Sequence, residues 1–525
     1  MGRLARAGIA AGPPRGLSRR RLLQAAVAVA GAGIADGGRI LAQPKFHEYP
    51  FSLGVASGDP TTDGIVLWTR LAPDPLDGGG MDEFDVPVDW MVATDPHFAH
   101  VVRRGTSIAS PEWAHSLHVE VDGLQQDRWY WYRFLIGGVS SPVGRTRTLP
   151  ERGSAAARLR IAIASCQHFE QGWFSAYRHM LDDDLDFVVH VGDYIYEGSW
   201  GAQVRRHESP QAALTLDDYR NRHACYKRDA DLAGAHAAYP WLVTWDDHDV
   251  ANDYAGLVPN DGEPPAEFAL RRAAAYRAYY EHMPLRAVHR PGANGGMLMQ
   301  SRVDFGDLAR IHLVDDRQYR APHPCAERGE MVRDCAQRFA SDQTMFGAAQ
   351  ERWLADGLAS SPARWNVLAQ QTLIAPFESR ASDGGYDVWT DGWDGYAGAR
   401  SRLLRFIEAA QVRNVVAVGG DMHAFYVSDL KTDFDDAGAA PVATEFVGTS
   451  ITSDDVDYAA ISADLPHNPH IRYFESRWRG YLYCEITPEL WRTDLRIVDN
   501  VQNAASSGRT LARFHVEDGR PGAQV

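Results

Sequence analysis

The sequence predicts an α/β protein in which a small all-β domain precedes a larger layered domain. Residues 46–150 contain several short strand-like segments separated by turn signals, which is typical of an all-β domain. From residue 158 onward, short apolar strands alternate with helical segments, which is typical of α/β layers. The length of 525 residues leaves room for more than one domain, and the hydrophobic fraction of 45% is ordinary for a globular chain.

Residues 1–42 are predicted to be an export signal that is removed from the mature protein. The stretch SRRRLLQ precedes a short apolar run rich in alanine and glycine, as the basic head and apolar middle of a signal peptide do. Arg19 and Arg20, with two leucines behind them, resemble the twin-arginine signal. An ordinary secretory signal with a chance run of arginines is the alternative. We therefore expect a bacterial protein that is periplasmic or secreted, with the twin-arginine translocase as its partner during export.

The net charge of the chain is −16, and this value excludes some classes of partner. A nucleic-acid scaffold role and an anionic membrane surface both require a basic footprint on the protein. No internal segment is long and apolar enough to span a bilayer, so we expect no stable membrane span. The negative charge is compatible with a small phosphate-ester substrate, because bound metal ions would supply the positive charge that a phosphate needs.

The all-β domain is expected over residues 46–150. Its candidate strands read GIVLWTRL, VDWMVAT, SLHVEV and RWYWYRFLI. Leu124 shortly precedes Tyr130 and Tyr132, a pattern that resembles the tyrosine corner of immunoglobulin and fibronectin-like sandwiches. Residues 150–157 read as a linker. We therefore predict a small immunoglobulin-like or fibronectin-like β-sandwich, followed by a larger domain over residues 158–515.

The strands of the larger domain are each followed at once by polar side chains that can bind a ligand. The segments read RLRIAIASC, FVVHVGD, YPWLVTWDDHD, ARIHLVDDRQYR and NVVAVGGDMH. In open α/β sheets, ligands bind at the carboxyl ends of the strands. A single acidic loop of this kind is usually a solvated cap, but several in one domain are hard to attribute to chance. The candidate site residues are Cys166, Asp193, Tyr196, Asp247, His248, Asn252, Asp421 and His423.

The order of these motifs resembles that of the calcineurin-like metallophosphatases, in which blocks similar to GD, DDHD and GGDMH follow one another. The variants SCQ, GDYIYE, WDDHDVANDY and LVDDRQYR, with the N-terminal FSLGVASGDPTTDGIVLWTRLAP, resemble one branch, the PhoD-type alkaline phosphatases and phosphodiesterases. The resemblance covers essentially the whole chain after the leader. It implies a layered αββα metallophosphatase domain behind the β-sandwich. One departure is that the family usually has Leu-Asp-Thr-Arg where this chain has Val314-Asp315-Asp316-Arg317.

Four donors of different chemistry predict an Fe³⁺ site. Asp193 can give one carboxylate oxygen to each of two metal ions. Tyr196 lies within a helical turn of Asp193, and only a strongly Lewis-acidic ion would hold a phenolate whose ordinary pKa is about 10. Cys166 would supply a soft thiolate and His423 an imidazole, and both suit iron. The alternatives are structural: a strand-end cap for Asp193, a core tyrosine and a buried cysteine.

The oxygen donors Asp247, Asn252 and Asp421 suit a harder ion beside the iron. Asp247 stands where relatives use an asparagine and Asp421 where they use a histidine, and both changes favour Ca²⁺ over Zn²⁺. The resemblance implies one or two calcium ions. Gln371 lies where relatives place another histidine ligand. Two further candidates, as ligands or as neighbours that orient them, are Asp246 and Asp253.

Two residues are predicted to act on the substrate. The resemblance implies that His248 faces the leaving group as a general acid and is oriented by the neighbouring Asp249. The guanidinium of Arg317 offers a planar fork for phosphate oxygens. The alternatives are a structural surface histidine for His248 and an ordinary ion pair of Arg317 with Asp315 or Asp316.

The predicted function is that of an exported, metal-dependent phosphoesterase of the alkaline phosphatase D type. Metal ions would bind the ester and activate a water for attack on phosphorus, so that no phosphoenzyme forms. Phosphate monoesters, phosphodiesters or both are the expected substrates. The alternatives are a phospholipase D-like phosphodiesterase acting on lipid or cell-wall polymer, and a non-enzymatic exported binding protein.

The five cysteines fit an oxidising compartment. Cys325 and Cys335 flank a short polar loop and are predicted to form a disulfide bond, with two free surface thiols as the alternative. Cys166 belongs to the predicted iron site. The sequence indicates no role for Cys225 and Cys484.

Overall fold

A computed structural model describes residues 46–525 with the exception of residues 334, 382, 437 and 455. Residues 46–525 form one compact unit. The predicted export signal, with its twin arginines, lies outside the described residues. Within the part of the chain that the structure describes, no helix has the length and hydropathy that crossing a membrane would require.

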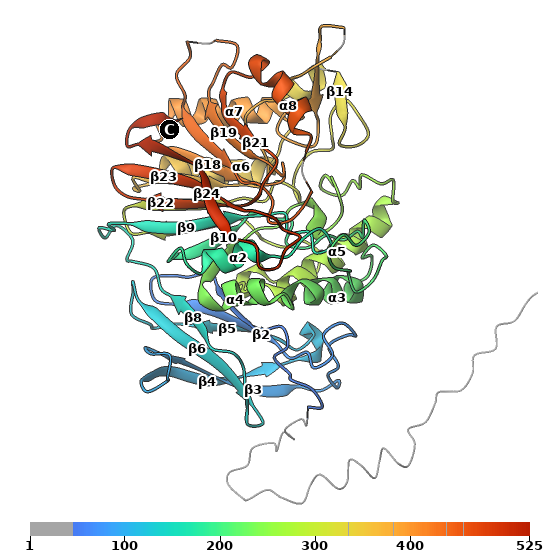
Figure 1. Ribbon diagram of the computed structural model, residues 1–525, viewed down its shortest axis with the longest axis vertical. Helices are drawn as coiled ribbons and strands as arrows, with labels where there is room; N and C mark the ends of the chain where they lie inside the picture. The colour runs from blue at the N-terminus through green and yellow to red at the C-terminus, as the bar shows by residue number, and fades with distance from the viewer. Residues whose placement is uncertain (1–45, 334, 382, 437, 455) are drawn as a thin grey trace, which may run out of the picture. The chain divides into compact units, whose positions relative to one another are not determined.

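Two large sheets are stacked in the centre of this unit (Figure 1). The first has ten strands, in the spatial order β25 (Arg520–Gln524), β24 (Gly508–Glu517), β23 (Leu490–Val498), β22 (Arg479–Ile486), β9 (Leu159–Ala164), β10 (Phe187–His190), β11 (Pro240–Val243), β1 (Val55–Gly58), β2 (Ile65–Arg70) and β5 (Ser116–Val121). The second has seven strands, in the order β12 (Ser301–Phe305), β13 (Ala309–Leu313), β15 (Trp365–Ala369), β18 (Val415–Gly419), β20 (Ala443–Val447), β19 (Phe425–Leu430) and β21 (Ile471–Glu475). Apolar side chains from both sheets form one core between them, including Ile161, Val189, Ile311 and Val367.

Helices cover the outer faces of both sheets (Figure 1). The first sheet is covered by α2 (Ser175–Met180), α3 (Leu216–Lys227), α4 (Ala230–Ala238) and α5 (Pro265–His282). The second is covered by α6 (Gly347–Ala359) and α7 (Ala397–Ala409). Successive strand residues point to opposite faces, so Ile161 of β9 packs between the sheets while Ala162 packs under the helices. Burial on both faces explains the continuous apolar strands of the sequence, and the predicted αββα layering is confirmed.

The central strands are parallel and bring their carboxyl ends to one edge of each sheet. β9, β10 and β11 pair in parallel in the first sheet, and β13, β15, β18 and β20 do so in the second. Cys166 follows β9, Asp193 follows β10 and Asp247 follows β11. Asp421 and His423 follow β18. The fold therefore gathers the polar ends of strands that are far apart in the sequence.

The N-terminal region is all-β, as predicted, but it shares a sheet with the larger region. Its own sheet has the order β4 (Val101–Ala109), β3 (Val86–Ala93), β6 (Trp129–Ile136) and β7 (Val139–Ser140), with β8 (Gly144–Arg147) beside β6. The opposing layer is the end of the ten-stranded sheet, where β1 pairs in parallel with β11. The hydroxyl of Tyr130 accepts a hydrogen bond from the Gln125 amide at 2.8 Å, as in a tyrosine corner. The domain boundary at residues 150–157 stays a prediction.

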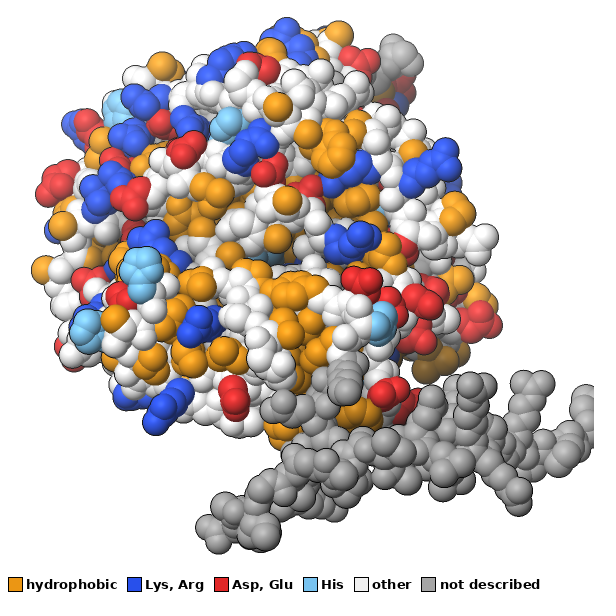
Figure 2. Space-filling view, turned by 60° about the horizontal axis from the view of Figure 1, so that its bottom comes forward, with side chains coloured by type: hydrophobic (Ala, Val, Ile, Leu, Met, Phe, Trp, Pro, Cys, Tyr) orange, Lys and Arg blue, Asp and Glu red, His pale blue; other side chains and the backbone are white. Residues whose placement is uncertain are grey.

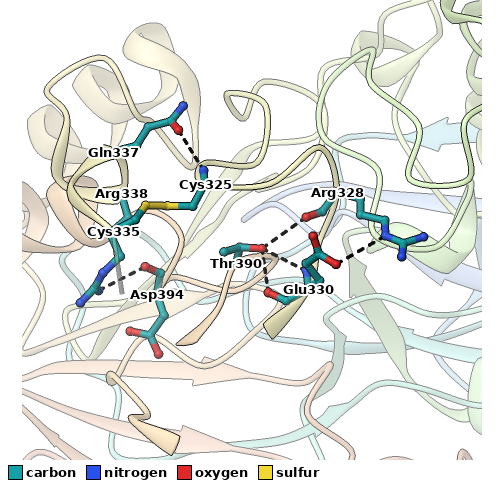
Figure 3. The surroundings of a disulfide bond; sticks show 8 residues. All are labelled: Cys325, Arg328, Glu330, Cys335, Gln337, Arg338, Thr390 and Asp394. Atoms are coloured by element: carbon teal, nitrogen blue, oxygen red, sulfur yellow. Dashed lines mark hydrogen bonds and ion pairs between the residues drawn. A yellow bond between two sulfur atoms is a disulfide. The ribbon is translucent and has the colours of Figure 1, made fainter. Parts of the chain in front are cut away.

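Two insertions, the first after β13 and the second after β15, together form a small third sheet. Its strands are β14 (Met331–Arg333), β17 (Tyr386–Trp389) and β16 (Ser379–Arg380). Cys325 and Cys335 in the first insertion form the predicted disulfide bond, with their Cα atoms 6.3 Å apart (Figure 3). A further short helix, α8 (Tyr458–Asp464), lies on the same side of the molecule (Figure 1). Cys225 and Cys484 are free, buried thiols in α3 and β22.

Charged side chains are dispersed over the face of the molecule that Figure 2 shows. Lysine and arginine side chains lie there among acidic and apolar ones rather than in one broad patch. The net charge of the whole chain is −16. This face therefore offers no broad basic patch that could bind a phosphate group.

Candidate metal centre

Several predicted ligands lie at points where the chain leaves a strand in an unusual backbone conformation. The φ angles of Cys166, Asp193, Asp421 and His423 are +58°, +55°, +61° and +50°. This left-handed region is uncommon for residues other than glycine and costs on the order of 1–3 kcal/mol for each residue. Strained residues of this kind cluster at functional sites, where the surrounding fold holds them. The sharp turns are the local reason that side chains from separate strands reach one point.

A glycine permits one of these turns to approach its neighbour. Gly192 precedes Asp193 and has a φ angle of +116°. A Cβ atom at this position would lie 2.3 Å from the Cβ of Asp246 and 2.6 Å from its backbone nitrogen. Only glycine therefore lets the end of β10 pack directly against the end of β11. This packing places Asp193 beside the acidic residues that follow β11.

One group of donors, which we name the soft-donor cluster, consists of Cys166, Asp193, Tyr196 and His423. The Cys166 thiol, an Asp193 carboxylate oxygen and a His423 ring nitrogen all lie within 4.8 Å of one another. The Tyr196 hydroxyl donates a hydrogen bond to Asp193 Oδ2 at 2.9 Å and lies 3.2 Å from His423 Nε2. Cys166, Asp193 and Tyr196 are buried, and His423 is partly buried. The structure thus brings together all four residues predicted to bind iron.

Neighbouring groups fix the orientation of the soft-donor cluster. The Nδ1 atom of His423 lies 2.8 Å from the Asp454 carbonyl oxygen, which leaves Nε2 facing the cluster. The Ser453 hydroxyl lies 2.6 Å from the Tyr196 oxygen and 2.8 Å from the Cys166 carbonyl oxygen. Ser453 was not predicted from the sequence, because a serine in the segment after β20 carries no distinguishing signal.

A second group, which we name the carboxylate cluster, consists of Asp193, Asp246 and Asp247. One oxygen from each carboxylate lies within 4.8 Å of the others. All three side chains are buried. The Oδ2 atom of Asp246 and the Oδ1 atom of Asp247 have no hydrogen-bond partner among the described residues. The Asp247 atom lies 3.5 Å from the Arg317 guanidinium, which leaves Asp246 Oδ2 as the buried carboxylate oxygen of this cluster without a partner among the described residues, and this fits a bound cation.

Burial raises the pKa of most carboxyl groups in and around this cluster, whereas for Asp247 the charges of Arg317 and His248 outweigh burial and lower the pKa. Burial and the nearby Asp247 carboxylate raise the pKa of Asp193 well above its usual range. Burial does the same to the pKa of Asp246, although Arg317 acts against it. Burial raises the pKa of Asp253 to about 9, with the charges of Asp391 and Asp247 adding to the effect. A divalent or trivalent cation would relieve this repulsion, and thiolate, phenolate, imidazole and carboxylate donors suit iron and a hard ion together.

The other predicted oxygen donors lie around the two clusters. Burial raises the pKa of Asp421 to about 6, and Asp247 is one of the acidic charges that add to the shift. The Nε2 atom of Gln371 donates to the Val314 carbonyl oxygen at 2.8 Å, and its Oε1 atom has no partner among the described residues. Asn252 is exposed, and its backbone amide donates to Glu197 Oε1 at 2.9 Å. Asn252 is therefore the least enclosed of the predicted ligands.

His248 lies beside the soft-donor cluster but has a different partner from the one predicted. Its Nδ1 atom lies 2.8 Å from Glu197 Oε2, and its ring centroid lies 4.4 Å from that of Tyr196. Burial alone would lower the pKa of His248, but the Glu197, Asp247 and Asp193 carboxylates outweigh burial and raise it well above the usual range.

The predicted orienting role of Asp249 is wrong. Its carboxylate accepts hydrogen bonds from the backbone amides of Asp246 at 3.0 Å and Ile195 at 3.1 Å, so both of its oxygens hold the turn. Glu197, and not Asp249, is the acid that contacts the His248 ring. Its signal was present, because this acid directly follows Tyr196 in the GDYIYE motif.

Arg317 is completely enclosed, which favours the ion-pair alternative for this residue. Its guanidinium donates to Asp246 Oδ1 at 2.5 Å and to both oxygens of Asp391 at 2.9 and 2.7 Å. It also lies 3.7 Å from Asp316, one of the two partners considered from the sequence. Its exposed fraction is 0%. Asp391 comes from the second insertion, between β15 and α7, and no sequence pattern marked it as part of the site.

Comparison with known proteins agrees with this geometry. A family model described as "PhoD-like phosphatase" matches residues 161–495, and one described as "PhoD-like phosphatase, N-terminal domain" matches residues 37–150. The chain belongs to the PhoD-like phosphatase family. This PhoD-like phosphatase is 45% identical over 514 residues to the alkaline phosphatase D of Bacillus subtilis (strain 168), a match that covers 94% of the chain and 87% of that relative.

A solved structure supports the same assignment. The structure titled "Structure of PhoD" aligns with a TM-score of 0.88 and 45% identity, and the alignment covers 92% of this chain and 93% of that one. The predicted resemblance and fold are therefore confirmed. This PhoD-like phosphatase is a phosphoric ester hydrolase of the alkaline phosphatase D type, with a buried acidic cluster that fits metal ions.

Proposed function

We propose that this phosphatase hydrolyses phosphate monoesters, phosphodiesters or both, with Fe³⁺ held by the soft-donor cluster and one or two Ca²⁺ ions held beside it. The calcium donors would be Asp247, Asn252 and Asp421, with the remaining carboxylate-cluster oxygens next to them. The observation that supports the proposal best is the position of Asp193. This residue belongs to both clusters, so one carboxylate can serve two ions.

The metals and the protein would contribute different things to the reaction. Ions in such a site offset the charge of a phosphate ester and lower the pKa of a bound water. The protein holds the donors in place through the turns at Cys166, Asp193 and Asp421. It also excludes solvent, since most of the donor side chains are buried. A Ser, Thr or Asp nucleophile is not needed, so no phosphoenzyme is expected.

His248 is proposed to give a proton to the leaving oxygen. Glu197 holds its Nδ1 atom at 2.8 Å, which leaves Nε2 available for a substrate. The nearby carboxylates stabilise the charged imidazolium, which is the form that can donate. Arg317 is proposed to offset the charge of Asp246 and Asp391 and thereby to hold the carboxylate cluster in position.

The test is hydrolysis by protein purified with its metals, together with metal analysis. We expect the intact protein to cleave 4-nitrophenyl phosphate, bis(4-nitrophenyl) phosphate or both, and to contain iron and calcium. Activity lost after treatment with a calcium chelator should return with Ca²⁺. Restoration by Zn²⁺ but not by Ca²⁺ would contradict the assignment of the hard-ion site. A protein that contains the metals and cleaves neither ester would contradict the proposed reaction.

The substrate panel also addresses the phospholipase D-like alternative. Two further substrates are tested beside the two small esters. One is phosphatidylcholine in vesicles, and the other is a glycerol phosphate polymer. A higher kcat/KM on either macromolecular substrate than on the small esters would favour that alternative.

Export through the twin-arginine pathway is proposed from the leader alone. Replacing Arg19 and Arg20 by Lys should leave the precursor in the cytosol if that pathway carries it. Unchanged export of the doubly substituted precursor would point to the general secretory route.

A further inference from the structure

A cavity of about 370 Å³ adjoins the metal centre. Asp421, Thr372 and Asp253 form the part of its wall that belongs to the centre, and the Thr372 hydroxyl donates to Asp421 Oδ2 at 2.5 Å. Most of the remaining wall is apolar, and its large side chains include Met331, Phe377, Trp389, Met422 and Ile461. An apolar pocket with a few polar groups at one end is the usual form of a small-molecule site.

We propose that this cavity, which we name the ester pocket, binds the organic group of the substrate, and that the enzyme therefore prefers phosphate esters of uncharged, apolar alcohols. The inference rests on the proposed function, because that function places the phosphate at the metals. The volume lies at the lower end of the range for small-molecule pockets. It suits an aromatic ring or a short alkyl chain.

The charges around the ester pocket exclude other organic groups. Its charged lining residues are Asp253, Asp394 and Asp421, and no lysine or arginine lines it among the described residues. Asp394 is already paired, since Arg400 lies 2.6 Å from its carboxylate. No basic side chain in this lining could pair with a second anionic group on the substrate, and burying such a group unpaired against the apolar wall disfavours esters with a carboxylate or a second phosphate. An apolar group meets no such penalty.

The two insertions together supply the outer wall of the ester pocket. Met331 in β14 and Trp389 in β17 are directly opposite each other in the antiparallel pair. Both line the pocket, yet their exposed fractions are 48% and 37%. Exposed large apolar side chains that gather at one place mark a binding surface, and methionine adapts its shape to different ligands. The cross-strand pair is therefore the natural contact for an incoming apolar group.

Hydrogen bonds between the two insertions fix this wall, as Figure 3 shows. The hydroxyl of Thr390, next to Trp389, accepts a hydrogen bond from the Glu330 amide at 3.0 Å. The Asp394 carbonyl oxygen accepts one from Arg338 at 3.3 Å. Arg338 lies three residues beyond Cys335 of the disulfide bond. These contacts connect the two segments that form the wall, so little ordering of the wall is expected on binding.

The first test is the rate of the metal-loaded enzyme on methyl, butyl and hexyl phosphate. Each methylene buried should raise kcat/KM about four-fold until the pocket is filled. Trp389→Ala and Met331→Ala should each lower the ratio of the hexyl to the methyl rate at least about four-fold. The matched control is Tyr386→Ala, which removes an exposed aromatic ring on the same strand that does not line the pocket, and it should leave this ratio unchanged.

Two outcomes would overturn the inference while leaving the proposed function intact. One is equal kcat/KM for all three esters, with no effect of Trp389→Ala. The other is a preference for 6-phosphohexanoate, which has a terminal carboxylate, over hexyl phosphate. A second measurement distinguishes failure of this inference from failure of the proposed function.

That measurement is the binding of the uncharged fluorescent probe N-phenyl-1-naphthylamine to the metal-loaded enzyme. We expect hexanol to displace the probe. We also expect Trp389→Ala to weaken binding of the probe, whereas Tyr386→Ala should leave it unchanged. Weakened binding in an enzyme that hydrolyses no ester would overturn the proposed function but support the apolar pocket. Binding that Trp389→Ala leaves unchanged would overturn the inference, whatever the activity.

Discussion

At the scale of single residues, the iron assignment depends most on Tyr196. Its hydroxyl is buried, and burial together with the Asp193 and Cys166 charges raises its pKa well above the usual range. Without a cation this phenol therefore keeps its proton and donates to Asp193. A phenolate at neutral pH would require a strongly Lewis-acidic metal, so the state of Tyr196 reports directly on the metal.

Substitution in the soft-donor cluster should change the colour of the protein. We expect the purified enzyme to have a visible charge-transfer band, because phenolate and thiolate donate charge to Fe³⁺. Tyr196→Phe and Cys166→Ala should each shift or abolish this band and lower the iron content. The control is Tyr194→Phe, which removes a buried hydroxyl two residues away that contacts His236 instead. A colourless, fully active enzyme without iron would contradict the assignment.

His248 should behave as an acid and not as a ligand. A general acid contributes about 10²–10⁴-fold and matters most when the leaving group is poor. His248→Ala should therefore keep its metals and much of its activity on aryl phosphates, while it loses far more on alkyl phosphates. The measurements are metal content and the two values of kcat/KM.

The contact with Glu197 provides a second variant for the same question. Glu197→Gln keeps the shape of the side chain but removes the charge that stabilises the imidazolium. We expect a smaller loss of kcat/KM than in His248→Ala, again larger for alkyl esters than for aryl esters. Equal losses on both ester classes, with a missing metal, would instead assign His248 to the metal ligands.

At the scale of secondary-structure elements, the strand ends were the most predictable part of the site. Apolar runs such as β9 and β10 are followed at once by Cys166 and Asp193, and parallel pairing necessarily brings such ends together. Side-chain partners were not predictable in the same way. Asp249 directly follows His248 in the sequence, and Glu197 belongs to the separate GDYIYE motif. Only the turn geometry decides which of these two acids contacts the His248 ring. Asp391 lies more than seventy residues from Arg317 in an insertion without a motif.

Helix α3 contains a buried lysine whose titration should be visible in the stability of the protein. Burial lowers the pKa of Lys227 to about 7. Its ammonium nitrogen lies 3.2 Å from the Tyr194 hydroxyl and 4.4 Å from the centre of the Trp68 ring. In the unfolded chain the ordinary pKa is about 10.4, so between pH 7 and pH 10 the unfolded state binds more protons than the folded state. The contribution of Lys227 to stability therefore rises with pH across this range.

Lys227→Met should remove this dependence on pH. We expect the variant to gain on the order of a few kcal/mol over the wild type near pH 7, and the difference to shrink toward pH 10. Denaturant unfolding of both proteins at several pH values measures the difference. A constant difference across the whole range would show that Lys227 does not titrate in the folded protein.

At the scale of the whole molecule, the N-terminal region is a structural part of the catalytic layer. β1 pairs in parallel with β11, the strand that leads to Asp246 and Asp247. The indole nitrogen of Trp68 in β2 donates to the Glu281 carbonyl oxygen of α5 at 3.0 Å. These contacts join the first hundred described residues to the sheet edge and to a covering helix. The sequence predicted two consecutive domains, because turn signals and strand patterns do not show that strands of both regions share one sheet.

This sharing predicts that a chain reduced to residues 158–525 will not fold stably. Its β11 would become an unprotected sheet edge, and the apolar surface that β1 and β2 cover would be exposed, so aggregation is expected. Residues 46–525 are the reference protein, and removal of the partly exposed edge strand β25 in residues 46–518 is the control. Size-exclusion chromatography and thermal unfolding, with the metals present, compare the three chains. We expect the control to stay monomeric with a Tm near that of the reference. β25 is the edge strand at the other end of the same sheet, separated by several strands from those that lead to the metal centre. A monomeric 158–525 chain with the same Tm and metal content would show that the N-terminal strands are an independent module rather than a part of the catalytic layer.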